Sequence, residues 1–287
     1  MNLAFDGRSP GLRRSVLKIF RWAAILLLLA FALAPFLWMI RTALSPKGEA
    51  YQAHPGLLPS HVTLGNFQRV VTSSTNPFAR QFLNTLLVST LTAVLSLVLG
   101  LSGAYALARM RFRGRTASSV LILLIQLFPP VLLAIPLFVV LNRLHLSDSL
   151  IGLVIAYSTI NVPFTVWVLR GYLESLPADM ENAARVDGCT TFGVLYRIVV
   201  PVMTPALAAV GVLAFVNAWN EYLLALVLVN DPDKQVLGVG LTSYVSQFAT
   251  DLPGLFAMAT LTSLPVVLLF LFLQRRLVSG LSAGAVK

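Results

Sequence analysis

The chain has 287 residues, of which 57% are hydrophobic and only 11% are charged, and its mean hydropathy is +0.82. Soluble domains carry roughly a quarter charged residues, so this composition excludes an ordinary water-soluble domain and indicates a chain whose solvent is largely lipid. The formal net charge of +10 could suggest nucleic acid, but arginines grouped between apolar segments are typical of membrane topology signals. The single cysteine, Cys189, excludes an internal disulfide, and we interpret it as a small packing residue.

Apolar runs long enough for a membrane-spanning helix, which needs about 20 residues, occur repeatedly along the chain. They cover 20–40, 83–107, 119–141, 150–169, 202–229 and 254–274. Several contain proline, which we interpret as kinks because neighbouring helices in a bundle satisfy the backbone groups that proline frees. The sequence therefore predicts an all-α polytopic membrane protein with six transmembrane helices, a transmembrane domain at 20–276 and short tails at 1–19 and 277–287.

The first apolar run has a second interpretation. Basic residues precede it and "ALAP" at 32–35 contains an A-x-A pattern, as in a cleaved secretory signal. However, Pro35 would follow the cut and is a poor residue there, and "FLWMI" extends the run to a spanning length. We favour an uncleaved first helix.

The basic residues indicate the orientation of the chain. Most of the 21 lysines and arginines fall on one face when the six spans are threaded back and forth. They are Arg8, Arg13, Arg14, Lys18, Arg21, Arg109, Arg111, Arg113, Arg115, Arg170, Arg185, Arg197, Arg275, Arg276 and Lys287. Because basic loops stay on the cytoplasmic side, we expect this face, and with it both termini, to be cytoplasmic.

The second predicted span carries small residues at every fourth position: Ser96, Gly100, Ala104 and Ala108. Such a stripe lets helix backbones approach closely in lipid. We favour close packing within the chain over a special dimer face. Outside the membrane, the connection at 41–82 is the longest, and it is too short to fold around a core of its own.

No catalytic or metal-binding pattern is found in the sequence. The three histidines, His54, His61 and His145, have no carboxylate at metal-ligand spacing. "GLSAG" at 280–284 matches G-x-S-x-G by letter but lacks the strand–turn–helix context of a nucleophile elbow. No lysine is followed by Ser or Thr, so a P-loop is excluded and this chain is not expected to be an enzyme.

The stretch at 177–201 is unusual for a simple connection between two spans. Pro177 suits a helix start, Asp179 and Glu181 lie near its positive end, and Gly188 is suited to a left-handed cap. Met180, Ala183, Ala184 and Asp187 would share one face of this helix. Thr190 or Thr191 would cap a second helix, which would present Phe192, Leu195, Tyr196 and Val199 on one side. The pattern predicts a helix–turn–helix on the cytoplasmic face, which could contact a protein or rest on lipid headgroups.

This stretch resembles the coupling-loop signature of bacterial ABC importer permeases, which reads E-A-A, three residues, Gly, nine residues, Ile, any residue, Leu-Pro. Counting from Gly188 places the signature on Asn182, Ala183, Ala184, Ile198, Val200 and Pro201. Asn182 replaces the signature's Glu, with Glu181 one position earlier, and Val200 replaces Leu. Further stretches, "LARMRFRGR" (107–115), 126–157, 169–188 and "WNEYLLALVLVND" (219–231), are similar to the six-helix permeases of the carbohydrate-uptake branch, of the maltose-transporter type.

The resemblance implies a set of partners and a membrane location. It implies a second permease subunit, two cytoplasmic ATPase subunits that bind ATP and Mg²⁺, an extracytoplasmic sugar-binding protein and the lipid of the bacterial cytoplasmic membrane. This chain itself is expected to hold no cofactor and no nucleic acid. The predicted contacts to the ATPase are Glu181, Asn182, Ala183, Ala184, Asp187, Gly188, Ile198 and Pro201.

Candidate substrate contacts lie in the fifth predicted span: Asn217, Asn220, Glu221 and Tyr222. An ionisable residue inside a membrane is a functional candidate, but Asn217 and Glu221 could equally pair within the bundle or lie near the outer mouth. The function predicted is a sugar importer permease. The alternatives are a permease for another polar solute, such as glycerol 3-phosphate, and an ion-coupled secondary transporter.

Overall fold

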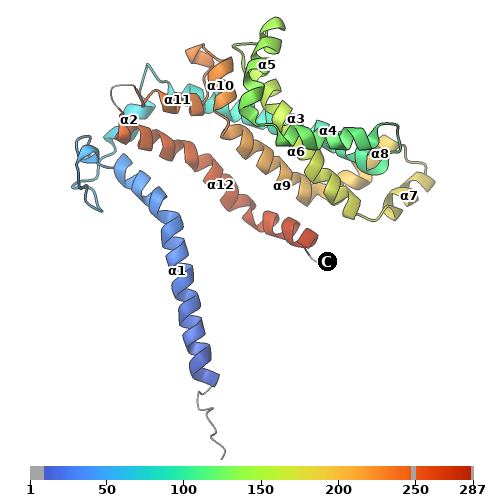
Figure 1. Cartoon of the computed structure of the whole chain (residues 1–287), viewed down its shortest axis with the longest axis horizontal. Helices are drawn as coiled ribbons and strands as arrows, with labels where there is room; N and C mark the ends of the chain where they lie inside the picture. Colours follow the sequence, from blue (N-terminus) through green and yellow to red (C-terminus); the bar gives the residue numbers. More distant parts are fainter. Residues whose placement is uncertain (1–9, 247–249, 286–287) are drawn as a thin grey trace, which may run out of the picture. The chain divides into compact units, whose positions relative to one another are not determined.

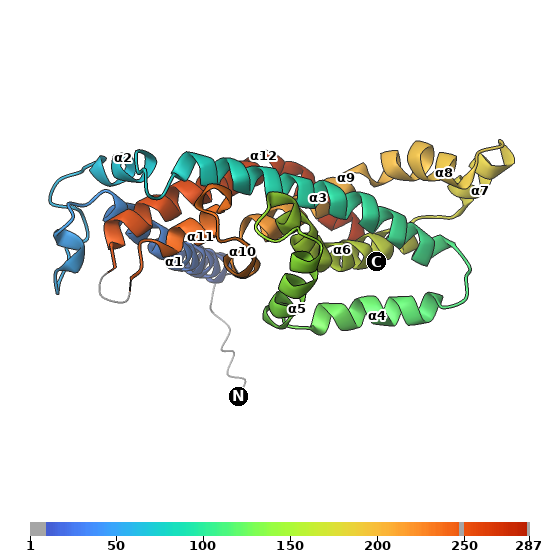
Figure 2. The same cartoon turned by 90° about the horizontal axis from the view of Figure 1, so that it is seen from above.

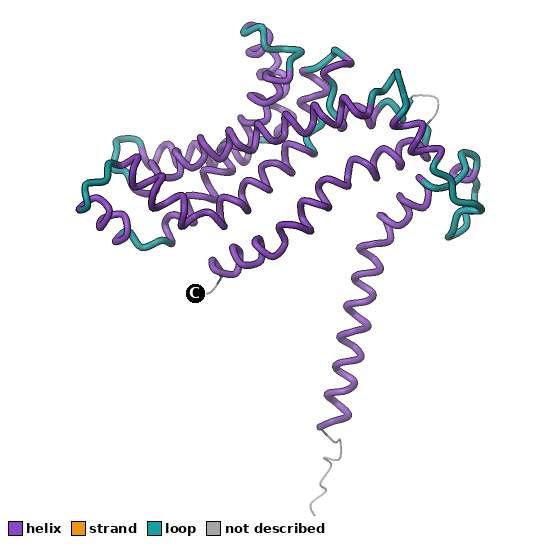
Figure 3. The backbone as a smooth tube through the Cα atoms, turned by 180° about the vertical axis from the view of Figure 1, so that it is seen from behind, coloured by secondary structure: helices purple, strands orange, loops and turns teal. Residues whose placement is uncertain are grey.

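The computed structural model describes residues 10–246 and 250–285, with side chains at 17–246 and 250–272. Helices make up most of this part of the chain (Figures 1 and 3), and its β-structure is one isolated bridge between Val245 and Thr250. The longer helices are α1 (Pro10–Ala43), α3 (Phe78–Arg109), α4 (Arg115–Leu127), α5 (Pro130–Arg143), α6 (Leu150–Ser175), α9 (Val200–Trp219) and α12 (Leu252–Ala285). The shorter ones are η1 (Glu49–Tyr51), α2 (Gly65–Val71), α7 (Asp179–Val186), α8 (Thr191–Val194), η2 (Leu195–Val199), α10 (Leu223–Leu228), η3 (Pro232–Lys234) and α11 (Leu237–Thr242).

The described residues confirm an all-helical fold of membrane type. Five helices are long and apolar enough to cross a bilayer, and the bent pair of α4 and α5 would make a sixth. The chain divides into two compact units, residues 1–69 with 251–260 and residues 70–250 with 261–287.

The first unit contains α1 and the connection that follows it. The described side chains of α1 are mostly exposed from Leu17 to Ile40, as expected of a helix surrounded by lipid. Past its end, Glu49 is buried and accepts hydrogen bonds from Arg41 and from the backbone and hydroxyl of Ser60. Arg69 forms an ion pair with Asp251 at 2.6 Å. These contacts give the connection a defined structure without a large apolar core.

The second unit is built on α3, α6 and α9, which pack against one another. The small-residue stripe of α3 faces α6, where a Cβ on Gly100 would overlap the methyl group of Thr165. Ser96 and Ala104 are fully buried on the same stripe. Only a side chain no larger than hydrogen fits opposite Thr165. The stripe therefore packs within the chain, which is the interpretation that the sequence favoured over a dimer face.

The run at 119–141 was expected to form one continuous span, and the structure corrects this. α4 ends at Leu127, α5 begins at Pro130, and the two helices meet at 105° (Figure 2). The physical reason is the Pro129–Pro130 pair: a residue before proline avoids the α conformation, and Phe128 and Pro129 are both extended, with ψ near 127° and 126°.

The run at 202–229 is also broken. α9 ends at Trp219, and α10 starts only at Leu223.

The N-terminal part of α3 holds the segment that follows α10 in place. Asn84 donates to the carbonyls of Asp233 and Gln235, both at 2.9 Å, and the Thr85 hydroxyl accepts from the Leu237 backbone.

Candidate coupling site

The segment from α7 to η2 forms the predicted helix–turn–helix. α7 ends in a left-handed Gly188, whose φ is +84°. The backbone N–H of Gly188 donates to Arg185 O at 3.1 Å, and that of Cys189 donates to Ala184 O at 2.9 Å. This pair of bonds is the Schellman motif, which satisfies carbonyls at a helix end. Cys189 and Ala184 pack in the same apolar cluster, as the motif requires and as a packing role for the cysteine predicts.

The second helix begins where the sequence indicated, because the Thr190 hydroxyl accepts a hydrogen bond from Gly193 N at 3.2 Å. Its face differs from the prediction. Residues 195–199 form a π-turn, in which Val200 N donates to Leu195 O, directly before Pro201, which has no N–H for a regular α-helical bond. The four expected residues fall into two pairs.

The two pairs lie in different surroundings. Leu195 and Val199 are buried, whereas Phe192 and Tyr196 are 73% and 56% exposed, with their rings stacked 6.4 Å apart. The expectation that all four share one side was therefore wrong, and the exposed aromatic pair is left on the outer surface of the loop.

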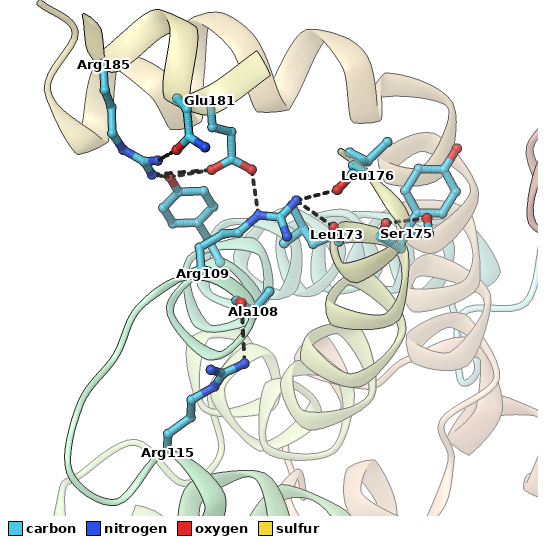
Figure 4. Close-up of polar contacts among 11 residues, drawn as sticks. Ala108, Arg109, Arg115, Leu173, Ser175, Leu176, Glu181 and Arg185 are labelled. Atoms are coloured by element: carbon cyan, nitrogen blue, oxygen red, sulfur yellow. Dashed lines mark hydrogen bonds and ion pairs between the residues drawn. The ribbon is translucent and has the colours of Figure 1, made fainter. Parts of the chain in front are cut away.

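Glu181 points into the protein rather than away from it (Figure 4). Its carboxylate accepts from Arg109 Nε at 2.6 Å and from the Tyr105 hydroxyl at 3.1 Å, both on α3. Arg109 Nη2 also donates to Leu173 O and Leu176 O, at 2.8 and 2.9 Å, at the end of α6. Arg109 thus joins three elements: the end of α3, the end of α6 and the coupling helix α7.

Arg185 closes this network from the solvent side. Its Nη2 donates to Tyr105 Oη at 3.2 Å and lies 3.5 Å from the Glu181 carboxylate. Its Nη1 donates to Asn182 Oδ1 at 3.0 Å. The side chain of Glu181 is 4% exposed and that of Arg109 is 14% exposed. We name the cluster of Tyr105, Arg109, Glu181 and Arg185 the anchor.

The eight predicted coupling residues divide by the direction they face. Glu181 and Ala184 are buried, and Ile198 is half-buried. Asn182, Ala183, Asp187, Gly188 and Pro201 are exposed. The exposed surface also includes Val186, at 88% exposure, which the sequence did not single out.

Sequence reasoning also missed the local roles of Tyr105 and Arg109. By sequence alone, Arg109 stands out only as part of a basic segment. The available signal is the spacing of four between the two residues, which places them on one face because α3 continues past the predicted span to Arg109. Nothing in the sequence assigns the acid that they share.

The four candidate substrate residues lie at the break between α9 and α10. The Glu221 carboxylate accepts from Leu224 N at 3.1–3.2 Å, so its position is that of a cap on α10. Asn217 is exposed on α9, and Asn220 donates to Val216 O of its own helix. Asn220 and Tyr222 line a pocket of ≈ 360 Å³, together with Trp219, Gly238, Leu241, Thr242 and Thr262.

Long apolar helices with a polar helix–turn–helix at the end of the packed bundle define this chain as a polytopic membrane protein of permease type. It belongs to the family described as "Binding-protein-dependent transport system inner membrane component", which residues 70–283 match. The chain is 36% identical to the sulfoquinovosyl glycerol transport system permease SmoH of Agrobacterium fabrum, over 97% of this chain and 98% of the relative. It is 32% identical to the trehalose transport system permease SugB of Mycobacterium tuberculosis, over 93% and 97%.

Solved structures show the same fold. A chain of a bacterial ABC transporter that imports the acidic polysaccharide alginate matches with a TM-score of 0.77 at 25% identity, covering 94% of this chain and 99% of that one. A chain of the MetNI methionine ABC transporter matches with a TM-score of 0.60 at 15% identity, covering 71% and 95%.

Proposed function

We propose that this chain is one membrane-spanning subunit of an ATP-driven, binding-protein-dependent importer for a sugar or oligosaccharide. The supporting observation is its membership of the inner-membrane permease family, with relatives named for sulfoquinovosyl glycerol and for trehalose along nearly their whole length. Glycerol 3-phosphate or another polar solute is the second candidate cargo.

The proposed assembly contains a second permease subunit, two cytoplasmic ATPase subunits and an extracytoplasmic sugar-binding protein. ATP and Mg²⁺ are bound by the ATPase subunits, because this sequence has no P-loop. Both termini and the α7–η2 segment lie on the cytoplasmic side, as the distribution of arginines indicates.

In this proposal the exposed surface around Asn182, Val186 and Gly188, with the aromatic pair Phe192 and Tyr196, docks on an ATPase subunit. Closure of the ATPase subunits displaces α7. The anchor transmits the displacement because its ion pair and hydrogen bonds tie α7 to both α3 and α6. The spans then move as rigid bodies to switch access across the membrane. Glu181 acts inside the chain, and Asn182 is the polar residue offered to the partner.

Substitution of Gly188 tests the docking surface. The side chain of Gly188→Asp would meet no atom within 4 Å of its Cβ in this chain, and Asp is among the residues that tolerate a left-handed backbone best. The fold should therefore survive while docking is blocked. We expect normal amounts of protein in the membrane, loss of uptake and loss of ATPase co-purification.

Gly114 provides a matched control. It has a φ of +95°, a Cβ added to it would meet no atom within 4 Å, and it precedes α4 outside the α7–η2 segment. Gly114→Asp introduces the same charge and also requires an aspartate with a positive φ, but it lies outside the docking surface. The variant should therefore retain uptake and ATPase binding. Normal uptake by Gly188→Asp, or equal loss in both variants, would contradict the docking assignment. The cargo itself is best identified by a thermal-shift screen of sugars on the companion binding protein.

A further inference from the structure

A pocket with a volume of ≈ 660 Å³ lies between α4 and α6 in the second unit. From α4 it is lined by Arg115, Thr116, Ser119, Val120 and Leu123, and from α6 by Trp167, Val168, Arg170, Gly171 and Glu174. The proposed docking surface does not include these residues, and neither does the anchor. We name the cavity between the two helices the α4–α6 pocket.

Polarity changes along the α4–α6 pocket in one direction. On α4 the charged and hydroxyl residues come first, and Val120 and Leu123 follow. On α6 the order is reversed: Trp167 and Val168 precede Arg170 and Glu174. Since α4 starts and α6 ends on the basic face, both gradients place the polar end at that face and the apolar end deeper. From Arg115 to Leu123 the helix rises by roughly 12 Å, at 1.5 Å per residue.

The polar end carries a net positive charge that the fold holds in place. Arg115 Nε donates to Leu107 O at 2.7 Å, so its guanidinium is oriented by a neutral carbonyl. Arg170 Nη1 donates to Ser119 Oγ at 2.6 Å, and its Nε pairs with Glu174 at 2.8 Å. Two arginines and one glutamate leave an excess of one positive charge. Fixed guanidinium groups beside hydroxyls are well suited to phosphate oxygens.

An ordered cationic end joined to an apolar end matches an amphiphile better than a free anion. A phosphodiester would lie between Arg115 and Arg170, and the first part of an acyl chain would lie against Val120 and Leu123. Trp167, which is 45% exposed, is of the type that lies at the level of lipid headgroups. Basic pockets between spans on the cytoplasmic side are known as headgroup sites.

We propose that the α4–α6 pocket binds an anionic phospholipid of the cytoplasmic leaflet, through its phosphate and the upper part of one acyl chain. The assignment rests on the orientation given in the proposed function. It requires no particular sugar and no transport step, so binding of lipid is measured independently of uptake.

The test uses the whole transporter complex purified from membranes and reconstituted in nanodiscs of phosphatidylglycerol and phosphatidylcholine. After extraction into detergent and washing, the phosphatidylglycerol retained per complex is measured by mass spectrometry. The loss of one charge-assisted hydrogen bond lowers affinity by about tenfold or more. We therefore expect Arg115→Gln with Arg170→Gln to retain at least about tenfold less phosphatidylglycerol than the unmodified complex.

Three further variants keep the result interpretable. Arg111→Gln removes an exposed arginine from the same α3–α4 connection but outside the pocket, and it should retain the lipid. Thr116→Glu cancels the net charge at an exposed lining position without removing either arginine, so it should lose the lipid even if the double variant fails to fold. Thr116→Gln is its neutral control and should retain it.

Three outcomes would overturn the proposal. Retention could be equal in the Thr116→Glu and Thr116→Gln complexes. Inorganic phosphate added at 10 mM could displace the retained phosphatidylglycerol as effectively as added phosphatidylglycerol does, which would indicate a site for a free anion. A photo-crosslinker placed at Val120 could label a protein subunit rather than lipid, which would show that a partner chain covers the pocket. Loss of phosphatidylglycerol only in the variants of the α4–α6 pocket supports the proposal. Uptake measured in Arg111→Gln reports separately on the proposed function.

Discussion

Replacing Glu181 with alanine removes the acid from the anchor and leaves Arg109 without an acidic partner. The perturbation is severe because the Glu181 side chain is buried, at 4% exposure, and that of Arg109 is largely shielded, at 14%. Removing one member of a buried ion pair costs about 3–5 kcal/mol, since the remaining charge is desolvated and unpaired. Arg109 keeps its bonds to Leu173 O and Leu176 O, so we expect a cost near the lower limit, about 3 kcal/mol.

Glu174→Ala is a control of the same chemistry on the surface. Glu174 pairs with Arg170 at 2.8 Å at i,i+4 spacing, and its side chain is 45% exposed. Exposed pairs of this type contribute only about 0.3–0.5 kcal/mol. The expected loss in free energy of unfolding is therefore several-fold larger for Glu181→Ala than for Glu174→Ala, although each glutamate has an arginine partner at hydrogen-bonding distance.

Thermal unfolding of the purified complex at one fixed scan rate measures the difference. With about 2–4 °C per kcal/mol for chains of this size class, Glu181→Ala should lower the Tm by roughly 6–12 °C and Glu174→Ala by no more than about 2 °C. A Tm for Glu181→Ala within about 2 °C of that for Glu174→Ala would refute the anchor as a structural connection.

The conservative variant Glu181→Gln separates stability from transmission. Gln keeps an acceptor for Arg109 but not the charge that roughly doubles the strength of the bond. We expect a smaller loss of Tm and more ATP hydrolysed per sugar imported, because α7 is tied less firmly to α3 and α6. An unchanged ratio of ATP hydrolysed to sugar imported, together with a lowered Tm, would show that the anchor is structural only.

Two further predictions test other parts of the fold. Gly100→Ala should destabilise the bundle by about 2 kcal/mol, because its methyl group overlaps Thr165, whereas Gly171→Ala, which has nothing within 4 Å, should be neutral or stabilising. Adding Thr165→Ser removes the overlapping methyl group but not the Thr165 Cβ, so it should recover part of the loss in Tm. Equal Tm values for Gly100→Ala and Gly171→Ala would contradict the packing argument. Hydrogen bonds from the backbone and hydroxyl of Ser60 lower the pKa of Glu49 below its usual 4.5, so its contribution to stability is complete above that pH and lost as the pH falls through the lowered value. The hydrogen-exchange protection of residues 44–64, expressed relative to the intrinsic exchange rate at each pH, should fall in that acid range and should not fall there in Glu49→Gln; an equal fall in protection in both proteins would refute this role of Glu49.

The local features of the coupling site could be predicted from the sequence. Gly188 adopts the left-handed cap and Thr190 the N-cap, because both depend on a few consecutive residues and on the intrinsic preferences of glycine and threonine. The stripe through Gly100 was predicted for the same reason, since helical periodicity alone places its members on one face.

The direction of Glu181 could not be predicted. A helix places Glu181 and Asn182 about 100° apart around its axis, since 3.6 residues make one turn, and sequence spacing alone does not say which of them faces the protein. The answer depends on Arg109, which is 72 positions away in the sequence and ends a different helix. The exposure of Phe192 and Tyr196 was likewise not predicted, because helical periodicity placed them on one side with Leu195 and Val199, which are buried.

The amino-acid sequence alone is enough to predict an all-helical membrane protein, the positions of most of its long helices and the turn that ends α7, because apolar run length and local backbone preferences act over short distances. The three-dimensional structure was needed to show that α4 and α5 meet at 105°, that α9 ends at Trp219, and that Glu181 is an internal anchor rather than an exposed acid. Pro129 and Pro130 mark the first break locally, whereas the direction of Glu181 depends on a distant element, because a charge is buried only where another element supplies its partner.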